Sequence, residues 1–159
     1  MTTTFDMFIE TEVPEDELIV SRTDFSGKIT YVNETFAEIS GYKPEELIGK
    51  SHNVIRHPDM PKSAFADMWK TIQRGDAWEG YVKNLRKDGG YYWVFARMST
   101  VVKEGEPIEY KSVREPVSRA KKIEMQNLYD KLRSEEEDMT RVVLYVKNEK
   151  LEIAESLET

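Results

Sequence analysis

The most constraining feature of the sequence is a series of three strand-like runs at residues 78–87, 91–102 and 107–117. They are rich in aromatic and β-branched residues, which favour extended backbone. Glycine turns at residues 87–90 and around Gly105 separate them, and short glycine-containing loops join antiparallel neighbours. The pattern predicts an antiparallel meander, which excludes an all-helical fold.

Residues 18–75 predict strands and helices in front of this meander. Two short β-rich runs around Gly27 indicate a hairpin. Asn33 is a predicted N-cap for a short helix, and a second short helix begins at Pro44. A loop at residues 50–60 precedes an amphipathic helix, so the fold class is α+β. The apolar face of that helix carries Phe65, Met68, Trp69 and Ile72.

The two ends of the chain differ from its middle. Residues 1–17 contain six acidic residues and no basic one, and we interpret them as an arm or short cap in which Phe5, Phe8 and Ile9 are packing candidates. A charged helix is predicted from its N-cap Ser118. Residues 141–154 fit either a hairpin around Asn148 or a longer helix. We therefore expect an arm at 1–17, a central domain at 18–117 and a helical extension or output segment at 118–159.

Strand alternation gives the meander two distinct faces. Trp78, Val82 and Asn84 point to one side of the first run, and Ala96 and Met98 share a side of the second that suits the floor of a cavity. A buried asparagine suits the imide edge of a planar heterocycle, although a bond to a nearby loop is an equal alternative. The opposite, aromatic face suits a partner surface, the N-terminal arm or helices of the same chain. It carries Tyr91, Trp93 and Phe95.

Composition excludes several classes of function. The sequence has no cysteine, so it can form no disulfide, zinc-thiolate site, thiol nucleophile or cysteinyl adduct to a cofactor. Any redox chemistry must therefore belong to a bound cofactor. A net charge of −7 argues against nucleic-acid binding. No apolar run is long enough to span a membrane, the N-terminus lacks the basic start of a signal peptide, and a cytoplasmic location is the simplest interpretation.

The residues suggest neither catalysis nor a metal site. No nucleophile elbow, P-loop, dinucleotide-binding glycine motif or HExxH motif is present in the sequence. Arg56, His57 and Asp59 lie in a proline-bounded loop before a helix, where Arg and His can pair with phosphate. Together with His52 they also imitate a 2-His-1-carboxylate site, but two histidines in one loop give poor facial geometry. We expect no enzyme and no bound metal.

Two blocks, HNVIRHPDMPKSAFADMW and VKNLRKDGGYYWV, resemble the flavin-binding PAS domains of the bacterial aerotaxis and energy-taxis family. This family includes Aer-like receptors and stand-alone CetB-like proteins. The resemblance covers residues 18–117, whereas more distant PAS domains share only the NxxFxxxxGY motif, the amphipathic helix and the KDG turn. It implies a PAS fold: a five-stranded antiparallel sheet in the order 2-1-5-4-3, with helices over one face that enclose FAD.

The resemblance also implies roles for individual residues. Arg56 and His57 are expected near the pyrophosphate or ribityl side of FAD, and Asn84 at the flavin imide edge. Trp69 and Trp78 are expected as aromatic walls. Asn33 falls on a motif position tied to FAD binding or pocket integrity. Asp59 does so too, or it caps the helix that starts near Pro61.

Comparison with blue-light PAS domains adds two positions. Their flavin-reactive cysteine lies in an Asn-Cys-Arg motif, and the comparable stretch is Asn53-Val54-Ile55, which excludes adduct photochemistry. Their switching glutamine aligns with Arg114. We expect flavin reduction to change the hydrogen-bond partners of Arg114 and to shift the last strand and the helix that follows it. The expected cofactor-binding residues are Asn33, Asn53, Arg56, His57, Asp59, Trp69, Trp78, Asn84 and Arg114.

The resemblance implies a redox or oxygen sensor for energy taxis that holds FAD non-covalently. Its expected partner is a membrane-bound methyl-accepting chemotaxis transducer or a HAMP-containing protein, reached by protein contact from the cytoplasm, with recruitment to the inner membrane through that partner. A PAS homodimer is a further expectation. Two alternatives stay open. One is a haem-PAS gas sensor with His52 or His57 as axial ligand, and the other is a ligand-free PAS module that dimerises through its aromatic face.

Overall fold

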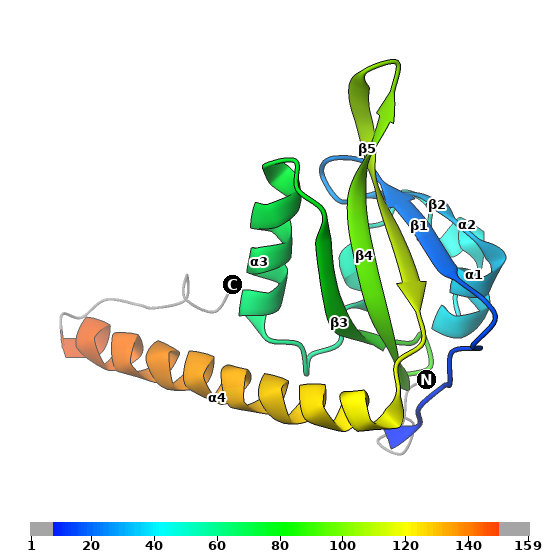
Figure 1. The fold of residues 1–159 in the computed structure, drawn as a ribbon. Helices are drawn as coiled ribbons and strands as arrows, with labels where there is room; N and C mark the ends of the chain where they lie inside the picture. Colours follow the sequence, from blue (N-terminus) through cyan, green and yellow to red (C-terminus); the bar gives the residue numbers. More distant parts are fainter. Residues whose placement is uncertain (1–7, 150–159) are drawn as a thin grey trace.

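A five-stranded antiparallel sheet forms the centre of the computed structural model, which describes residues 8–149 and the side chains of residues 8–136 (Figure 1). Its order is β2-β1-β5-β4-β3, as the resemblance implies, so the expected PAS fold is confirmed. The meander is its larger half, and its two glycine turns lie where predicted. The strands are β1 (Ile19–Thr23), β2 (Ile29–Val32), β3 (Trp78–Leu85), β4 (Tyr91–Lys103) and β5 (Glu106–Glu115).

Four short elements pack on one face of the sheet, here called the inner face. They are α1 (Glu34–Ser40), α2 (Pro44–Leu47), the 3-10 helix η2 (His52–Ile55) and α3 (Lys62–Gln73). Asn33 begins α1 as predicted, because its Oδ1 accepts a hydrogen bond from the backbone N–H of Phe36 at 3.0 Å. Phe36 and Ile39 of α1 are buried and join the central hydrophobic core.

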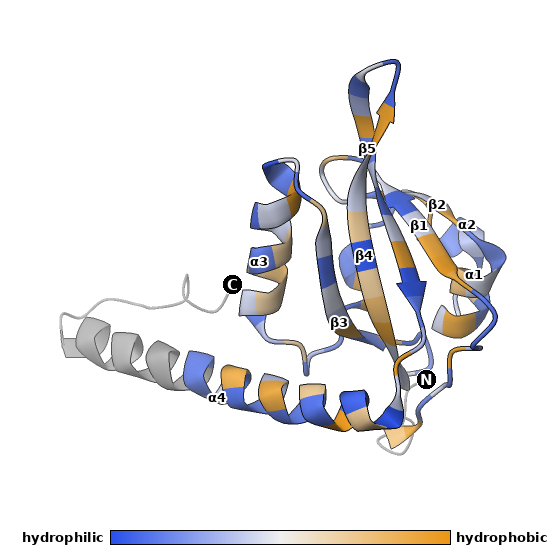
Figure 2. Cartoon of the chain, viewed as in Figure 1, coloured by the Kyte–Doolittle hydropathy of each residue, from blue (hydrophilic) through white to orange (hydrophobic). Residues whose placement is uncertain are grey.

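The long helix α4 (Arg119–Glu149) covers part of the opposite, outer face of the sheet. The Tyr129 ring stacks on Trp93 with centroids 6.2 Å apart, and the Tyr129 hydroxyl donates to the backbone oxygen of Tyr81. Figure 2 shows hydrophobic and hydrophilic residues alternating along the described part of α4, as expected for an amphipathic helix. The aromatic face of the meander is therefore covered largely by the chain itself.

The N-terminal arm completes this cover. Strand β5 pairs with β4 only from Phe95 onward, and the arm runs beside the free start of β4. There the backbone of Tyr91 donates to the oxygen of Ile9 at 3.0 Å and accepts from Thr11 at 2.8 Å. The predicted packing of Phe8 and Ile9 is wrong, since both are exposed, and Val13 packs into the core in their place. The third candidate, Phe5, lies outside the described residues.

The C-terminal region resolves one of the open alternatives. Helix α4 continues to Glu149, so the hairpin around Asn148 is wrong and the longer helix is confirmed as far as Glu149; residues 150–159 lie outside the described residues. Extending a helix already nucleated near Ser118 costs no second nucleation, which outweighs the β-propensity of residues 142–146. The Ser118 hydroxyl accepts from the N–H of Lys121 at 3.2 Å, as expected of the predicted cap. Within the described residues, no helix has the length and apolar character to cross a membrane.

Candidate functional site

A cavity of about 80 Å³ lies between the inner face of the sheet and the η2–α3 segment. Its floor is built by strand alternation: Trp78, Val82 and Asn84 of β3 point into it as predicted. The antiparallel register places the neighbouring strands in step, so Ala96 lies opposite Arg114. Six of the nine expected cofactor-binding residues line the cavity, namely Asn53, Arg56, Trp69, Trp78, Asn84 and Arg114.

Three polar atoms on the cavity floor make no hydrogen bond of ordinary length and angle to the described residues, although Asn84 lies close enough to the Tyr92 hydroxyl to oppose the rise of its pKa. They are Asn84 Nδ2, Ser112 Oγ and Arg114 Nη1, each buried from solvent. An unpaired buried polar group costs about 1–3 kcal/mol, so native structures rarely keep one without a partner. The three atoms come from β3 and β5, the strands on either side of β4, and offer donors to a ligand that presents acceptors. This donor set fits the acceptor-rich edge of a flavin ring.

Arg114 is held from its other side by two residues. Its Nη2 lies 2.8 Å from His52 Nε2 and 3.0 Å from Ser21 Oγ. Burial and the adjacent guanidinium lower the pKa of His52 to about 3, so the ring is neutral and Nε2 accepts the hydrogen bond. Burial lowers the pKa of Arg114 to about 10, which leaves it protonated at neutral pH. The pair presents a fixed positive charge toward the cavity.

Sequence reasoning missed the role of His52. It was considered only as a haem or metal ligand, and no local motif connects it with Arg114, which is 62 residues away. In the structure, His52 lines the cavity, but Arg114 occupies the ring nitrogen that an axial haem ligand would use.

Aromatic rings form the cavity walls. Trp78 folds back over Gly80, where a Cβ atom would lie only 2.4 Å from the indole ring. Its Nε1 donates to Asp67 of α3 at 3.0 Å, which ties the edge strand to that helix. Near the start of α3, the Arg56 guanidinium lies 3.9 Å from the centre of the Phe65 ring. The walls are thus aromatic and cationic, a combination suited to a planar ligand with anionic groups.

His57 does not line the cavity, and strand geometry explains why. Arg56 forms an isolated antiparallel bridge with Asn84, so the loop locally extends the sheet. Consecutive side chains in an extended segment point to opposite faces. Arg56 consequently points inward and His57 points to the outer face, where it packs edge-on against Tyr91. The expectation that both residues flank the same side of a cofactor is corrected accordingly.

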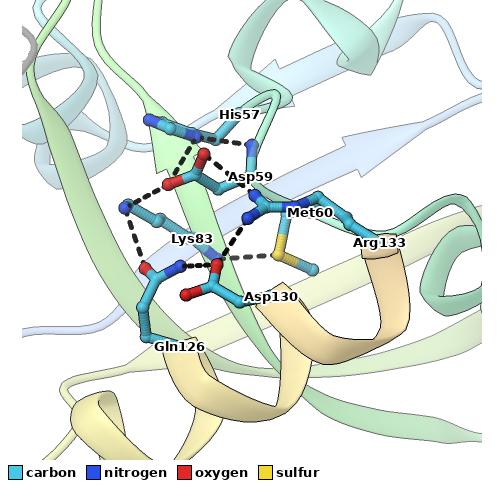
Figure 3. A network of polar contacts seen from close by, with 7 residues as sticks. All are labelled: His57, Asp59, Met60, Lys83, Gln126, Asp130 and Arg133. Atoms are coloured by element: carbon cyan, nitrogen blue, oxygen red, sulfur yellow. Dashed lines mark hydrogen bonds and ion pairs between the residues drawn. The ribbon is translucent and has the colours of Figure 1, made fainter. Parts of the chain in front are cut away.

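The outer face carries a polar network, which Figure 3 shows from close by. Asp59 Oδ2 accepts from Lys83 Nζ at 2.7 Å, and Oδ1 pairs with Arg133 Nη1 at 3.0 Å. Lys83 also donates to Gln126 of α4 at 2.9 Å. Burial alone would raise the pKa of Asp59, but the hydrogen bond and charge of Lys83 lower it below its ordinary value. The network joins the loop, β3 and α4.

Asp59 does not cap α3, so that alternative is wrong. Pro61 occupies the N-cap position of α3 without a side-chain hydrogen bond. Instead, the N–H groups of Lys62 and Ser63 donate to the carboxylate of Glu136 in α4, at 3.1 and 2.9 Å.

Asn33 does not line the cavity; its side chain makes hydrogen bonds that hold two elements of the fold together. Besides capping α1, its Oδ1 accepts from Val20 at 3.1 Å and its Nδ2 donates to the oxygen of Leu18 at 2.8 Å. It therefore joins α1 to β1.

The two histidines cannot share a metal ion in this arrangement, because His52 faces the cavity and His57 the outer face. The N–H of Asp59 donates to His57 Nδ1 at 2.9 Å. Burial and the charge of Lys83 lower the pKa of His57 to about 4, so this ring is neutral as well.

Sequence comparison identifies curated relatives of the chain. Over 104 residues the chain is 49% identical to the aerotaxis receptor of Escherichia coli (strain K12), and the match covers 65% of this chain and 21% of that receptor. It is 28% identical over 109 residues to a nitrogen fixation regulatory protein of Klebsiella pneumoniae, covering 68% of this chain and 22% of that protein. The chain thus spans about a fifth of the length of these relatives.

Solved structures agree on the fold. A light-oxygen-voltage domain studied with a flavin analogue superposes with a TM-score of 0.59 at 24% identity, over 72% of this chain and 87% of that one. The light-state LOV domain of the blue-light photoreceptor Aureochrome1 gives the same TM-score at 22% identity, over 76% and 91%. A family profile described as the PAS fold matches residues 29–114, which is more than half of the sequence. The chain therefore belongs to the PAS fold family.

Proposed function

We propose that this chain binds FAD non-covalently in the cavity and signals the redox state of the flavin to a chemotaxis transducer by protein contact. The observation that carries the proposal is the set of unpartnered polar atoms on the cavity floor, Asn84 Nδ2, Ser112 Oγ and Arg114 Nη1. The 49% identity of the chain to the aerotaxis receptor of Escherichia coli supports a role in taxis.

Charge in the cavity favours a ligand that gains negative charge. Arg114 is protonated and buried, and no acidic residue stands among the described residues that line the cavity. A flavin, when bound, supplies reversible redox chemistry that changes the charge and protonation of its hydrogen-bonding edge. Arg114 would stabilise the more negative form, since a buried positive charge without a counter-ion gains most from a nearby anion.

The position of Arg114 offers a route for a signal. It lies near the end of β5, and α4 begins four residues after that strand, at Arg119. A change in the partners of Arg114 would alter its contacts with Ser21 of β1 and His52 of η2, and with them the end of β5. The helix that follows would then carry the change to a partner.

The proposed partner is a membrane-bound methyl-accepting transducer or a HAMP-containing protein, met from the cytoplasm. A homodimer through the aromatic face has less support, because Trp93 is buried beneath Tyr129 of α4. A haem sensor also has less support, because Arg114 occupies His52 Nε2.

FAD titration of ligand-free protein tests the site. We expect Asn84→Ala and Arg114→Gln each to weaken FAD binding about tenfold, the effect of one lost buried hydrogen bond. Asn127→Ala, on the exposed surface of α4, is the matched control for Asn84→Ala and should bind as the wild type does. Equal affinity of all variants would show that FAD does not use this cavity.

Comparison of the oxidised and reduced proteins tests the signal. In Arg114→Ala we expect the redox-dependent change in hydrogen exchange of α4 to disappear. An unchanged redox response in this variant would remove Arg114 from the mechanism.

A further inference from the structure

The first turn of α3 receives its cap from a distant helix. The first amides of a helix have no partner within it, and Pro61 offers no side-chain cap. Glu136 of α4 accepts hydrogen bonds from the N–H groups of Lys62 and Ser63. Burial alone would raise the pKa of Glu136, but the bonds from Ser63 and Lys62 and the charge of Lys62 lower it. The carboxylate is therefore ionised, which suits the positive end of α3.

Arg133, one turn earlier on α4, holds the loop before α3 through its ion pair with Asp59. Arg133 and Glu136 together are here called the α4 strap. Both contacts hold residues 56–65, which form part of the cavity wall through Arg56 and Phe65, and the charge of Glu136 also acts on Arg56. The strap and the cavity thus share a single stretch of chain.

The cavity is smaller than the ligand proposed for it. Sites for molecules of cofactor size measure roughly 300–1,000 Å³, against about 80 Å³ here. The floor is a sheet of paired strands that resists displacement, whereas the wall at residues 56–65 is a loop and one helical turn. Enlargement therefore moves the wall away from the floor, and this displacement disturbs the contacts that the strap makes with the wall segment.

We propose that the α4 strap holds the cavity wall closed and is loosened when a ligand of flavin size enters, so that cavity occupancy controls the docking of α4. The inference rests on the proposed function, because it takes FAD as the ligand. Coupling of this kind is reciprocal: if FAD loosens the strap, weakening the strap must tighten FAD binding.

Hydrogen exchange and FAD titration of the whole chain test the inference. The test variant is Glu136→Ala, and its control is the exposed neighbour Glu135→Ala. Without FAD, we expect Glu136→Ala to raise exchange of the α3 amides at residues 64–69, and Glu135→Ala to leave it unchanged. With FAD, wild-type amides at residues 126–136 should exchange faster. Glu136→Ala should bind FAD about fivefold more tightly, the factor that one capping interaction of ordinary strength supplies.

Glu136→Gln removes the negative charge that acts on Arg56 but keeps an acceptor, so it separates capping of α3 from the effect of that charge. Its amide oxygen still accepts a hydrogen bond, so its exchange and FAD affinity should fall between those of the wild type and Glu136→Ala. If FAD binds but leaves exchange of α4 unchanged and binds all variants equally, the strap proposal is overturned and the proposed function stands. If FAD does not bind at all, the proposed function fails and the coupling fails with it. Unchanged exchange of α3 in ligand-free Glu136→Ala would overturn the strap independently of FAD.

Discussion

The cavity holds a buried positive charge, on Arg114, directly beside a neutral histidine, His52. Arg114 needs an acceptor on each side of its guanidinium, and His52 supplies one only while its ring is unprotonated. Protonating His52 would place two positive charges 2.8 Å apart in a buried site. This arrangement makes the stability of the protein depend on pH.

We predict that acid destabilises the fold through His52. Its pKa is lowered from 6.5 to about 3 on folding. Between these values the unfolded chain binds a proton that the folded chain does not, so stability is complete above pH 6.5 and is lost progressively toward pH 3. Near pH 5 the loss is about 2 kcal/mol. Urea unfolding at pH 7 and pH 5 measures it. His52→Gln, which does not titrate, should lose less stability, and an equal loss in both proteins would contradict this role.

Gly80 is predicted to be essential for the position of Trp78. A methyl group there would meet the indole ring, which must move and give up its bond to Asp67. We expect Gly80→Ala to lower the free energy of unfolding by about 1–3 kcal/mol, measured by urea denaturation. In a Trp78→Phe background the same substitution should cost less. An equal cost in both backgrounds would show that contact with the indole is not the cause.

The sequence allowed some site residues to be placed and not others, for a physical reason. Strand alternation is local, so it correctly put Asn84 and Ala96 on the cavity side of the meander. The loop at residues 56–57 offers no such pattern, and its alternation becomes evident only through the bridge of Arg56 to Asn84. The contact between His52 and Arg114 depends on tertiary structure alone.

Helices and strands in this fold are joined by a few polar side chains. Asn33 connects α1 with β1, and Asp59 connects the loop before α3 with β3 and α4. Neither residue lines the cavity, so substituting either one should lower the free energy of unfolding more than it changes ligand affinity.

We predict that Asn33→Ala lowers the free energy of unfolding by about 1–2 kcal/mol, through loss of the cap and of the bonds to β1. FAD affinity of the folded protein should stay near that of the wild type. Asn33→Asp keeps the acceptor for Phe36 but loses the donor to Leu18, so an intermediate loss is expected. Thermal unfolding measures the loss of stability, and FAD titration at low temperature measures the affinity of the folded protein. Weaker FAD binding at unchanged stability would assign Asn33 to the cofactor site instead.

Asp59→Asn should destabilise the protein by about 1–3 kcal/mol, because it leaves Lys83, with a side chain only 10% exposed, without its anion. The matched control is Asp76→Asn, whose ion pair with Arg74 is exposed on both sides and contributes little. Chemical denaturation of both variants measures their free energies of unfolding. If the two substitutions cost the same, the outer network does not contribute to stability.

Elements with local signals were predicted well and the C-terminal region was not. The caps Asn33 and Ser118 and the glycine turns of the meander follow from local backbone chemistry. Residues 142–146 have high β-propensity but continue α4, because propensity is a weak guide beside an existing helix. The cap that Glu136 gives to α3 spans more than seventy residues and has no local signal.

At the scale of the whole molecule, α4 and the cavity lie on opposite faces of one sheet, and the segment at residues 56–65 contacts both. The strand order and the family could be predicted from the sequence, because the motifs of the meander and of the loop at residues 50–60 are specific to PAS domains. The docking of α4 on the outer face could not be predicted, since three alternatives for covering that face were equally consistent with its aromatic residues.

Binding of FAD in the cavity is the central claim, and the absorption spectrum of the purified protein tests it most directly, together with mass analysis of any cofactor released on denaturation. The account predicts flavin absorption in the blue, reversible loss of that absorption on reduction, and release of FAD. A Soret band of haem, or no visible absorption after incubation with FAD, would contradict it.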